Sequence, residues 1–174
     1  MHALAVVILT GLLLSVQTVL GPKMAVLGAR PDWLLVFVVF IGLYAAAPRA
    51  VIVGWFVGLC ADLMSIERLG VMSLSYGLVT LVLVVVRGYL FRHSVLTQAG
   101  VTFLLCLLLW AAWYTYASLL YTFRGAISHV LLVALYTAAL APLVHGVLLR
   151  AGPLIGVPRP RRGPLGFQPG YTDV

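Results

Sequence analysis

The sequence contains very little charge for its length. Of its 174 residues only 9% are charged, four acidic against eleven basic, whereas 63% are hydrophobic. A soluble domain has roughly a quarter of its residues charged, so the composition excludes a soluble globular protein and predicts an integral membrane protein. The excess of basic residues would indicate nucleic acid in a soluble protein. Here it indicates membrane orientation and contact with anionic lipids, and we expect no nucleic-acid partner.

The sequence is also poor in residues that carry out catalysis or bind metals. Its two cysteines, Cys60 and Cys106, lie in apolar runs without a CxxC pair or a histidine at metal-ligand spacing, so we expect free thiols and no metal site. There is no GxSxG, HExxH or P-loop motif. Asp62 and Glu67 are five positions apart, which puts them about 140° apart around a helix and in different sites. We therefore expect no enzyme and no cofactor.

Long apolar runs are what the sequence has in abundance. A helix that crosses a membrane needs about 20 mostly apolar residues. Six runs approach or exceed this length: 3–20, 33–47, 50–65, 70–86, 95–121 and 126–149. The first lacks the basic start of a cleaved secretory signal, so we expect it to be retained as a span. The second and third are short, so a re-entrant pair is an alternative to two transmembrane helices. The sequence predicts an all-α integral membrane protein, a six-transmembrane-helix bundle over residues 1–150.

The segment after Arg150 has a different composition. It is rich in Pro, Gly and Arg, which is typical of a chain that does not fold, so residues 151–174 are predicted to be a mobile tail. Six spans place both termini on one side of the membrane. Basic residues at span ends favour the cytoplasmic side. The terminal side would carry Arg49, Arg87, Arg92, Arg150, Arg159, Arg161 and Arg162, and the other side Lys23, Arg30, Arg68 and Arg124. We therefore predict that both termini are cytoplasmic.

Asp62 is a carboxylate in an almost unbroken apolar segment. At 100° per residue, Gly54, Gly58 and Asp62 fall on one side of a helix, and glycines four residues apart allow helices to approach closely. An acid within a membrane segment is costly and is a functional candidate. Because Asp62 lies near the helix end, an interfacial or structural role, bonded to the next helix or to Arg68, is an equal alternative. We expect the substitution Asp62→Asn to leave membrane insertion intact.

Weakly polar side chains line one side of several other helices. Examples are Tyr76 in the fourth run and Gln17 in the first, and they indicate a slightly polar bundle interior. His129 shares a helix face with Tyr136, and we expect a hydrogen-bonded core histidine there. His145 is expected to lie at the membrane interface.

Two stretches of the sequence are "RPDWLLVFVVFIGL" and "GWFVGLCADLMSIERLGVMSLSYGL". Together they resemble the MreD family, the rod-shape-determining membrane proteins of bacteria. The family shows Arg-Pro-Asp at the start of a helix, a glycine-rich span that ends in Gly-xxx-Asp-Leu, and Leu-Gly before the next helix. The matching residues are Arg30, Pro31, Asp32, Gly54, Gly58, Asp62, Leu63, Leu69 and Gly70. The turn "SIER" and the Arg/Pro tail depart from the family pattern.

The resemblance implies a non-enzymatic component of the bacterial cell-elongation machinery in the inner (plasma) membrane. Such a protein would act with MreC, MreB and the RodA–transpeptidase complex in regulating lateral peptidoglycan synthesis, with membrane lipids as further partners and a homodimer left open. The implied candidates for helix packing or partner interaction are Arg30, Asp32, Gly54, Gly58, Asp62 and Gly70. The family also resembles the six-helix substrate-binding subunits of energy-coupling vitamin transporters. The alternative function is therefore a subunit that binds a small molecule.

Overall fold

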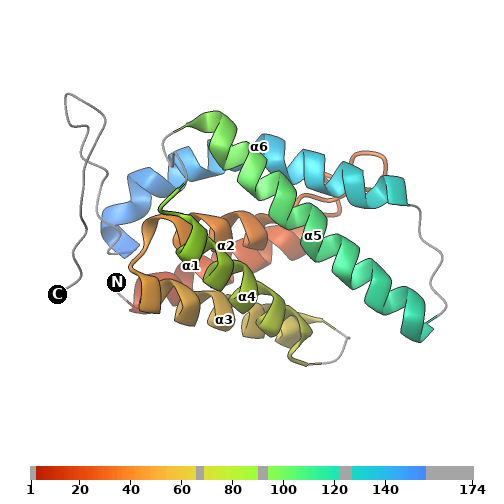
Figure 1. Cartoon of the computed structure of the whole chain (residues 1–174), viewed down its shortest axis with the longest axis horizontal. Coiled ribbons are helices and arrows are strands. Elements are labelled where there is room, and N and C mark those ends of the chain that lie inside the picture. The colour runs from red at the N-terminus through yellow and green to blue at the C-terminus, as the bar shows by residue number, and fades with distance from the viewer. Residues whose placement is uncertain (1–2, 66–68, 90–93, 122–126, 156–174) are drawn as a thin grey trace.

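The computed structural model describes residues 3–65, 69–89, 94–121 and 127–155, which form helices apart from turns and one isolated bridge between Val26 and Ala29. The elements are α1 (Ala3–Ser15), η1 (Val16–Leu20, a π-helical turn), α2 (Trp33–Tyr44), α3 (Ala47–Met64), α4 (Val71–Val86), α5 (Val95–Tyr121) and α6 (Ile127–Ile155). Successive helices run back and forth between the two ends of an elongated bundle, and α1 begins at the end where α6 finishes (Figure 1). The predicted all-α class is confirmed.

The number of membrane crossings follows only in part from helix length. Among the described residues, four helical segments are long and apolar enough to cross a membrane: Ala3–Leu20, Ala47–Met64, Val95–Leu119 and Ser128–Gly152. The helices α2 and α4 are apolar but shorter, with 12 and 16 residues. Six spans therefore remain a prediction. Helix α6 continues to Ile155, beyond the predicted boundary at 150, and the rest of the predicted tail lies outside the described residues.

Helix α2 is the central helix of the bundle. Residues 34–43 are all buried, and the helix packs against α3, α4 and α6. A helix that is apolar around its whole circumference is suited to such complete burial. Charged side chains satisfy both of its ends: Oδ1 of Asp32 accepts the N–H of Leu35, and the Arg87 guanidinium donates to the carbonyl of Ala45. An anion at the start of a helix and a cation at its end also oppose the helix dipole favourably.

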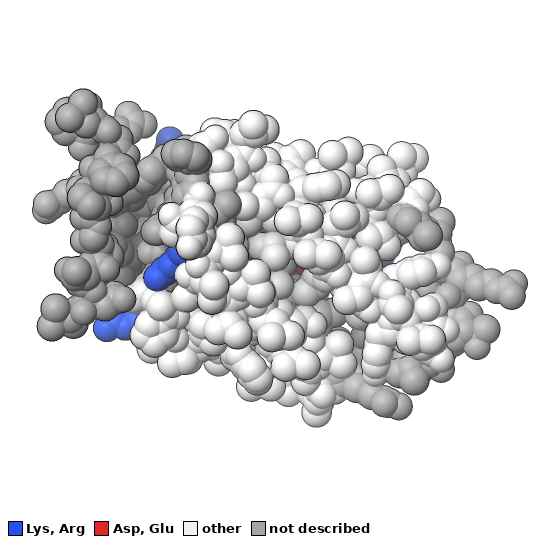
Figure 2. Space-filling model, in the orientation of Figure 1, with Lys and Arg blue, Asp and Glu red and all other residues white. Residues whose placement is uncertain are grey.

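The outer surface of the bundle is apolar. On α4, for example, Leu74, Leu81 and Val85 are about half exposed or more, and so is Leu104 on α5. The face seen in Figure 2 is almost uncharged, and its visible Lys and Arg side chains lie at the end where α1 begins. An apolar belt with basic residues toward one end is what a membrane protein requires.

The connection between η1 and α2 folds against α6. The Tyr136 hydroxyl donates to the carbonyl oxygen of Met24 at 3.2 Å, and Nε2 of His129 lies 3.2 Å from the carbonyl oxygen of Gly28. His129 is exposed, so its prediction as a core histidine was wrong. Its partner is loop backbone at the end of the bundle.

His145 is more buried than predicted. It is fully buried against the rings of Phe40 and Tyr44, with Nε2 3.3 Å from the carbonyl oxygen of Val36. The prediction of an interfacial histidine was therefore wrong. The reason is that α6 continues to Ile155, which leaves His145 well inside the helix and facing α2.

Candidate functional site

Asp62, in the last turn of α3, caps the helix that follows. The side chain is 1% exposed. Its Oδ2 accepts the N–H groups of Gly70 and Ser73 at 3.0 and 2.9 Å, and its Oδ1 accepts the N–H of Met72 at 3.0 Å. These groups belong to Gly70, directly before α4, and to the first turn of α4, where N–H groups have no partner within the helix and the helix dipole is positive. The intramembrane carboxylate is thus bonded to a helix terminus.

The backbone at the start of α4 is shaped for this contact. Gly70 has φ +103°, a left-handed conformation that glycine adopts at little cost. It directly precedes α4, and its N–H is one of the three that reach Asp62. The predicted partners in the next helix are therefore backbone groups. The other predicted partner, Arg68, lies outside the described residues.

The side of α3 that carries Gly54 and Gly58 lies directly against α4. A Cβ added to Gly58 would lie 2.4 Å from the Cα of Ser73, and one added to Gly54 would lie 2.4 Å from Oγ1 of Thr80. Both distances are far below ordinary van der Waals contact, so only glycine fits at these positions. We call this contact the α3–α4 seam; it consists of Gly54, Gly58 and Asp62 on α3 and Ser73, Gly77 and Thr80 on α4.

Asp32 lies where residues from several helices meet. The side chain is 4% exposed. Besides capping α2, it accepts the Tyr76 hydroxyl of α4, which lies 3.2 Å from each carboxylate oxygen. Its backbone N–H donates to Oγ1 of Thr137 in α6 at 3.0 Å. The N–H of the adjacent Trp33 donates to Oε1 of Gln17 in η1 at 2.8 Å. This network joins the start of α2 to η1, α4 and α6.

The surroundings of the Asp32 carboxylate contain donors but no cation. Among the described residues, the groups placed against it are the N–H of Leu35, the hydroxyl of Tyr76 and the side chains of Gln17 and Trp110, all neutral. A carboxylate offers about four positions for hydrogen bonds, and the Tyr76 proton is shared between its two oxygens. Nε1 of Trp110 is buried and lies near this carboxylate, without the geometry of a full hydrogen bond. The carboxylate is therefore surrounded by neutral donors, and the Trp110 N–H is one of them.

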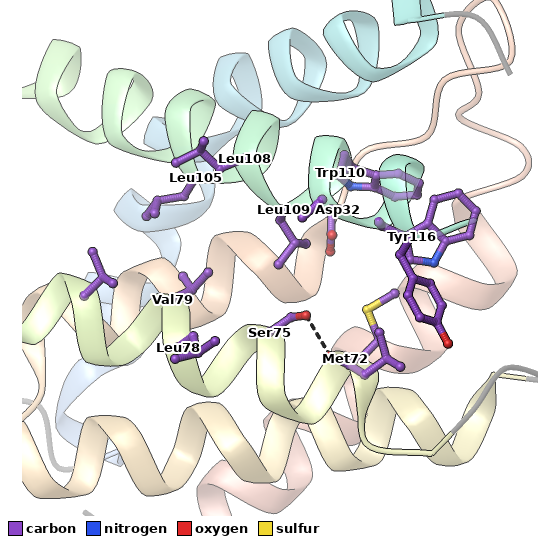
Figure 3. A pocket seen from close by; sticks show the side chains of 14 residues that line it. Asp32, Met72, Ser75, Leu78, Val79, Leu105, Leu108, Leu109, Trp110 and Tyr116 are labelled. Atoms are coloured by element: carbon purple, nitrogen blue, oxygen red, sulfur yellow. Dashed lines mark hydrogen bonds between the residues drawn. The ribbon is translucent and has the colours of Figure 1, made fainter. Parts of the chain in front are cut away.

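Asp32 also forms the floor of a groove between α4 and α5. The two helices stand apart because α5 packs mainly against α6. The space between them is about 440 Å³, within the range of about 300–1,000 Å³ that is usual for small-molecule sites. In Figure 3 Asp32 reaches into this space from α2, and in Figure 2 an acidic side chain is just visible at the bottom of a hollow. We call it the α4–α5 groove; its walls include Ser75, Leu78 and Val82 on α4 and Leu105, Leu109 and Tyr116 on α5.

The six candidate residues from the sequence separate into different surroundings. The glycines Gly54 and Gly58 lie at the α3–α4 seam, and Asp62 and Gly70 lie next to each other at its end. Asp32 belongs to a separate network, and Arg30 is exposed. Among the described residues no group of three His, Cys, Asp or Glu side chains could hold a metal ion, and Cys60 and Cys106 are free thiols.

Two residues beside Asp32, Thr137 and Trp110, could not be selected from the sequence. Tyr76 and Gln17 belong to weakly polar helix faces, so the sequence predicts that they lie in the bundle interior. No such pattern predicts an interior position for Thr137 and Trp110, because a threonine or tryptophan in an apolar helix is equally compatible with lipid contact. The α4–α5 groove depends on the separation of two helices, which no local pattern encodes.

Residues 1–150 match the family described as rod shape-determining protein MreD. The chain belongs to the MreD family. Neither a curated protein nor a solved structure matches the chain. Membership of the MreD family, together with the apolar helices, makes the chain an integral inner-membrane protein of the rod-shape-determining class. The comparisons give no support to the alternative of a vitamin-binding transporter subunit.

Proposed function

We propose that the chain is a non-enzymatic component of the cell-elongation machinery and acts with MreC, MreB and the RodA–transpeptidase complex in regulating lateral peptidoglycan synthesis. The observation that carries this proposal is the match to the MreD family over residues 1–150. The geometry supports a structural role for Asp62, because its carboxylate accepts three backbone N–H groups at the start of α4.

A depletion strain of a rod-shaped host tests this function. Expression of the chain, tagged for purification, should restore rod shape and should bring MreC with it from detergent extracts. The variant Gly58→Leu serves as a control with a reduced amount of folded protein, because its side chain would meet the α4 backbone. Round cells and no MreC, despite normal levels of the folded chain, would contradict the proposal.

We also propose that six helices cross the membrane and that both termini are cytoplasmic. Arg49, Arg87 and Arg150 lie at the end of the bundle where α1 begins, which the basic-residue bias assigns to the cytoplasm. Reporter fusions after Arg150 and within 87–93 should report a cytoplasmic location, and fusions within 22–30 and 122–125 an external one. A periplasmic signal from fusions after Arg150 would refute this orientation.

A further inference from the structure

The α4–α5 groove has a polar end and an apolar end. Figure 3 shows Asp32, Trp110 and Tyr116 gathered toward one end, whereas Val79 and Leu105 line the space toward the other. At the rims, Leu78 and Val82 on α4 and Leu108 on α5 are about half exposed. The groove therefore opens sideways on the apolar belt, where the surrounding medium is lipid.

The polar end has the composition of a site for an ammonium group. The Asp32 carboxylate is buried with only neutral donors around it in the described structure, and a buried carboxylate is costly without a compensating charge. Trp110 and Trp113 stand edge to face with ring centroids 5.6 Å apart, and both line the groove together with Tyr116. The faces of such rings attract cations. The N–H of Trp110 faces the same carboxylate.

The size of the groove limits what can occupy it. Its volume of about 440 Å³ lies in the range that is usual for small-molecule sites. It therefore suits one narrow chain with a small head.

We propose that the α4–α5 groove binds a membrane lipid with an aminoethyl-phosphate head, such as phosphatidylethanolamine. The ammonium group pairs with the Asp32 carboxylate among the aromatic rings. One acyl chain lies along Leu109 and Val79 toward Leu105. This inference stands independently of the rod-shape function proposed above.

Native mass spectrometry of the purified chain tests the proposal. The protein is released from nanodiscs that contain equal amounts of phosphatidylethanolamine and phosphatidylglycerol with identical acyl chains. The ethanolamine lipid should be retained in about tenfold excess, because only its head carries a cation for the buried carboxylate. The variant Asp32→Asn should bring the ratio close to one. Asparagine is an equally good helix cap, so a matching thermal midpoint would show that the fold is kept.

A second pair of variants tests the position of the acyl chain. Val82 and Val85 are both exposed valines on α4, but only Val82 lines the groove. The variant Val82→Phe should reduce retention of both lipids severalfold, whereas Val85→Phe should leave it unchanged. These two substitutions alter the outer surface only, so they remain informative even if Asp32→Asn does not fold.

Three results would overturn the proposal. The first is equal retention of both lipids by the unmodified chain, and the second is an ethanolamine preference that persists in Asp32→Asn. The third comes from cells with a photoreactive residue in place of Leu108 at the rim. A protein adduct at this position without any lipid adduct assigns the groove to a partner helix.

Discussion

Helix α4 packs closely against α3 on one side and borders an open groove toward α5 on the other. On the side of α3 the backbones touch, and even a methyl group on Gly58 would lie 2.4 Å from the Cα of Ser73. On the side of α5 the helices leave about 440 Å³ between them. Each side has one buried aspartate. Asp62 accepts three backbone N–H groups. Asp32 accepts one backbone N–H, and its other donors are the side chains of Tyr76, Gln17 and Trp110.

This difference separates a structural acid from one that is available for binding. Asp62 is buried and accepts three backbone N–H groups at the start of α4. Asp32 holds the start of α2 and still faces a space that opens on the lipid side. The family motif includes both aspartates, but their surroundings suit them to different tasks.

The largest expected effect comes from filling the seam with Gly58→Leu. The new side chain meets the α4 backbone, which cannot turn aside as a flexible side chain would. Overpacking of this kind typically costs about 1–3 kcal/mol, and occasionally more, so the yield of monodisperse protein should fall sharply. The matched variant Gly100→Leu lies on α5, where a Cβ would have nothing within 4 Å. It should behave like the unmodified chain, and equal yields from the two variants would show that the seam is not closed.

The second largest effect is expected from Asp62→Asn. The sequence alone predicts that this variant still inserts into the membrane. The structure predicts a loss of stability once the chain is inserted. An amide has one acceptor oxygen, so its NH₂ group must face at least one of the three N–H donors of α4. Leaving a buried donor unpaired costs about 1–3 kcal/mol.

The stability of Asp32→Asn, measured in parallel with that of Asp62→Asn, compares the two buried acids directly. The Tyr76 hydroxyl can rotate to accept a hydrogen bond from the new amide, and asparagine still caps α2. Thermal unfolding in detergent should therefore show a smaller loss for Asp32→Asn than for Asp62→Asn. A larger loss at Asp32 would reverse the assignment of the two acids.

The smallest effect is expected from Tyr76→Phe. It removes the hydroxyl bond to Asp32 and leaves the α3–α4 seam untouched. A single hydrogen bond of this kind contributes about 0.5–1.5 kcal/mol, so the thermal midpoint should fall slightly at normal yield. A collapse of yield similar to that of Gly58→Leu would show that the Asp32 network, too, is needed for folding.

The sequence predicts the helices well because long apolar runs determine them directly. The bounds of α5, 95–121, agree to the residue, and those of α4 agree to within one. The spacing of Gly54 and Gly58 likewise indicates close approach of a second helix, since it depends only on one helix face. These are properties that a single helix carries by itself.

Relations between helices could not be predicted in the same way. Core and lipid-facing positions are both apolar, so nothing in residues 34–43 distinguishes a central helix from a peripheral one. Backbone partners, such as those of Asp62, leave no mark in the sequence. His145 shows the same limit, because its burial depends on how far α6 continues and which helix it faces.

The central claim is that α4 is closed on the side of α3 and open on the side of α5, and two serines on this helix test it most directly. Ser73 lies in the seam, where its hydroxyl donates to the carbonyl of Trp55, and Ser75 lines the groove. Single cysteines at these positions, in a chain whose Cys60 and Cys106 are replaced by alanine, are labelled with N-ethylmaleimide in detergent. Ser75→Cys should react at least about tenfold faster than Ser73→Cys, since a thiol in a closed contact reacts only after local opening. Equal rates, or faster labelling of Ser73→Cys, would contradict the claim.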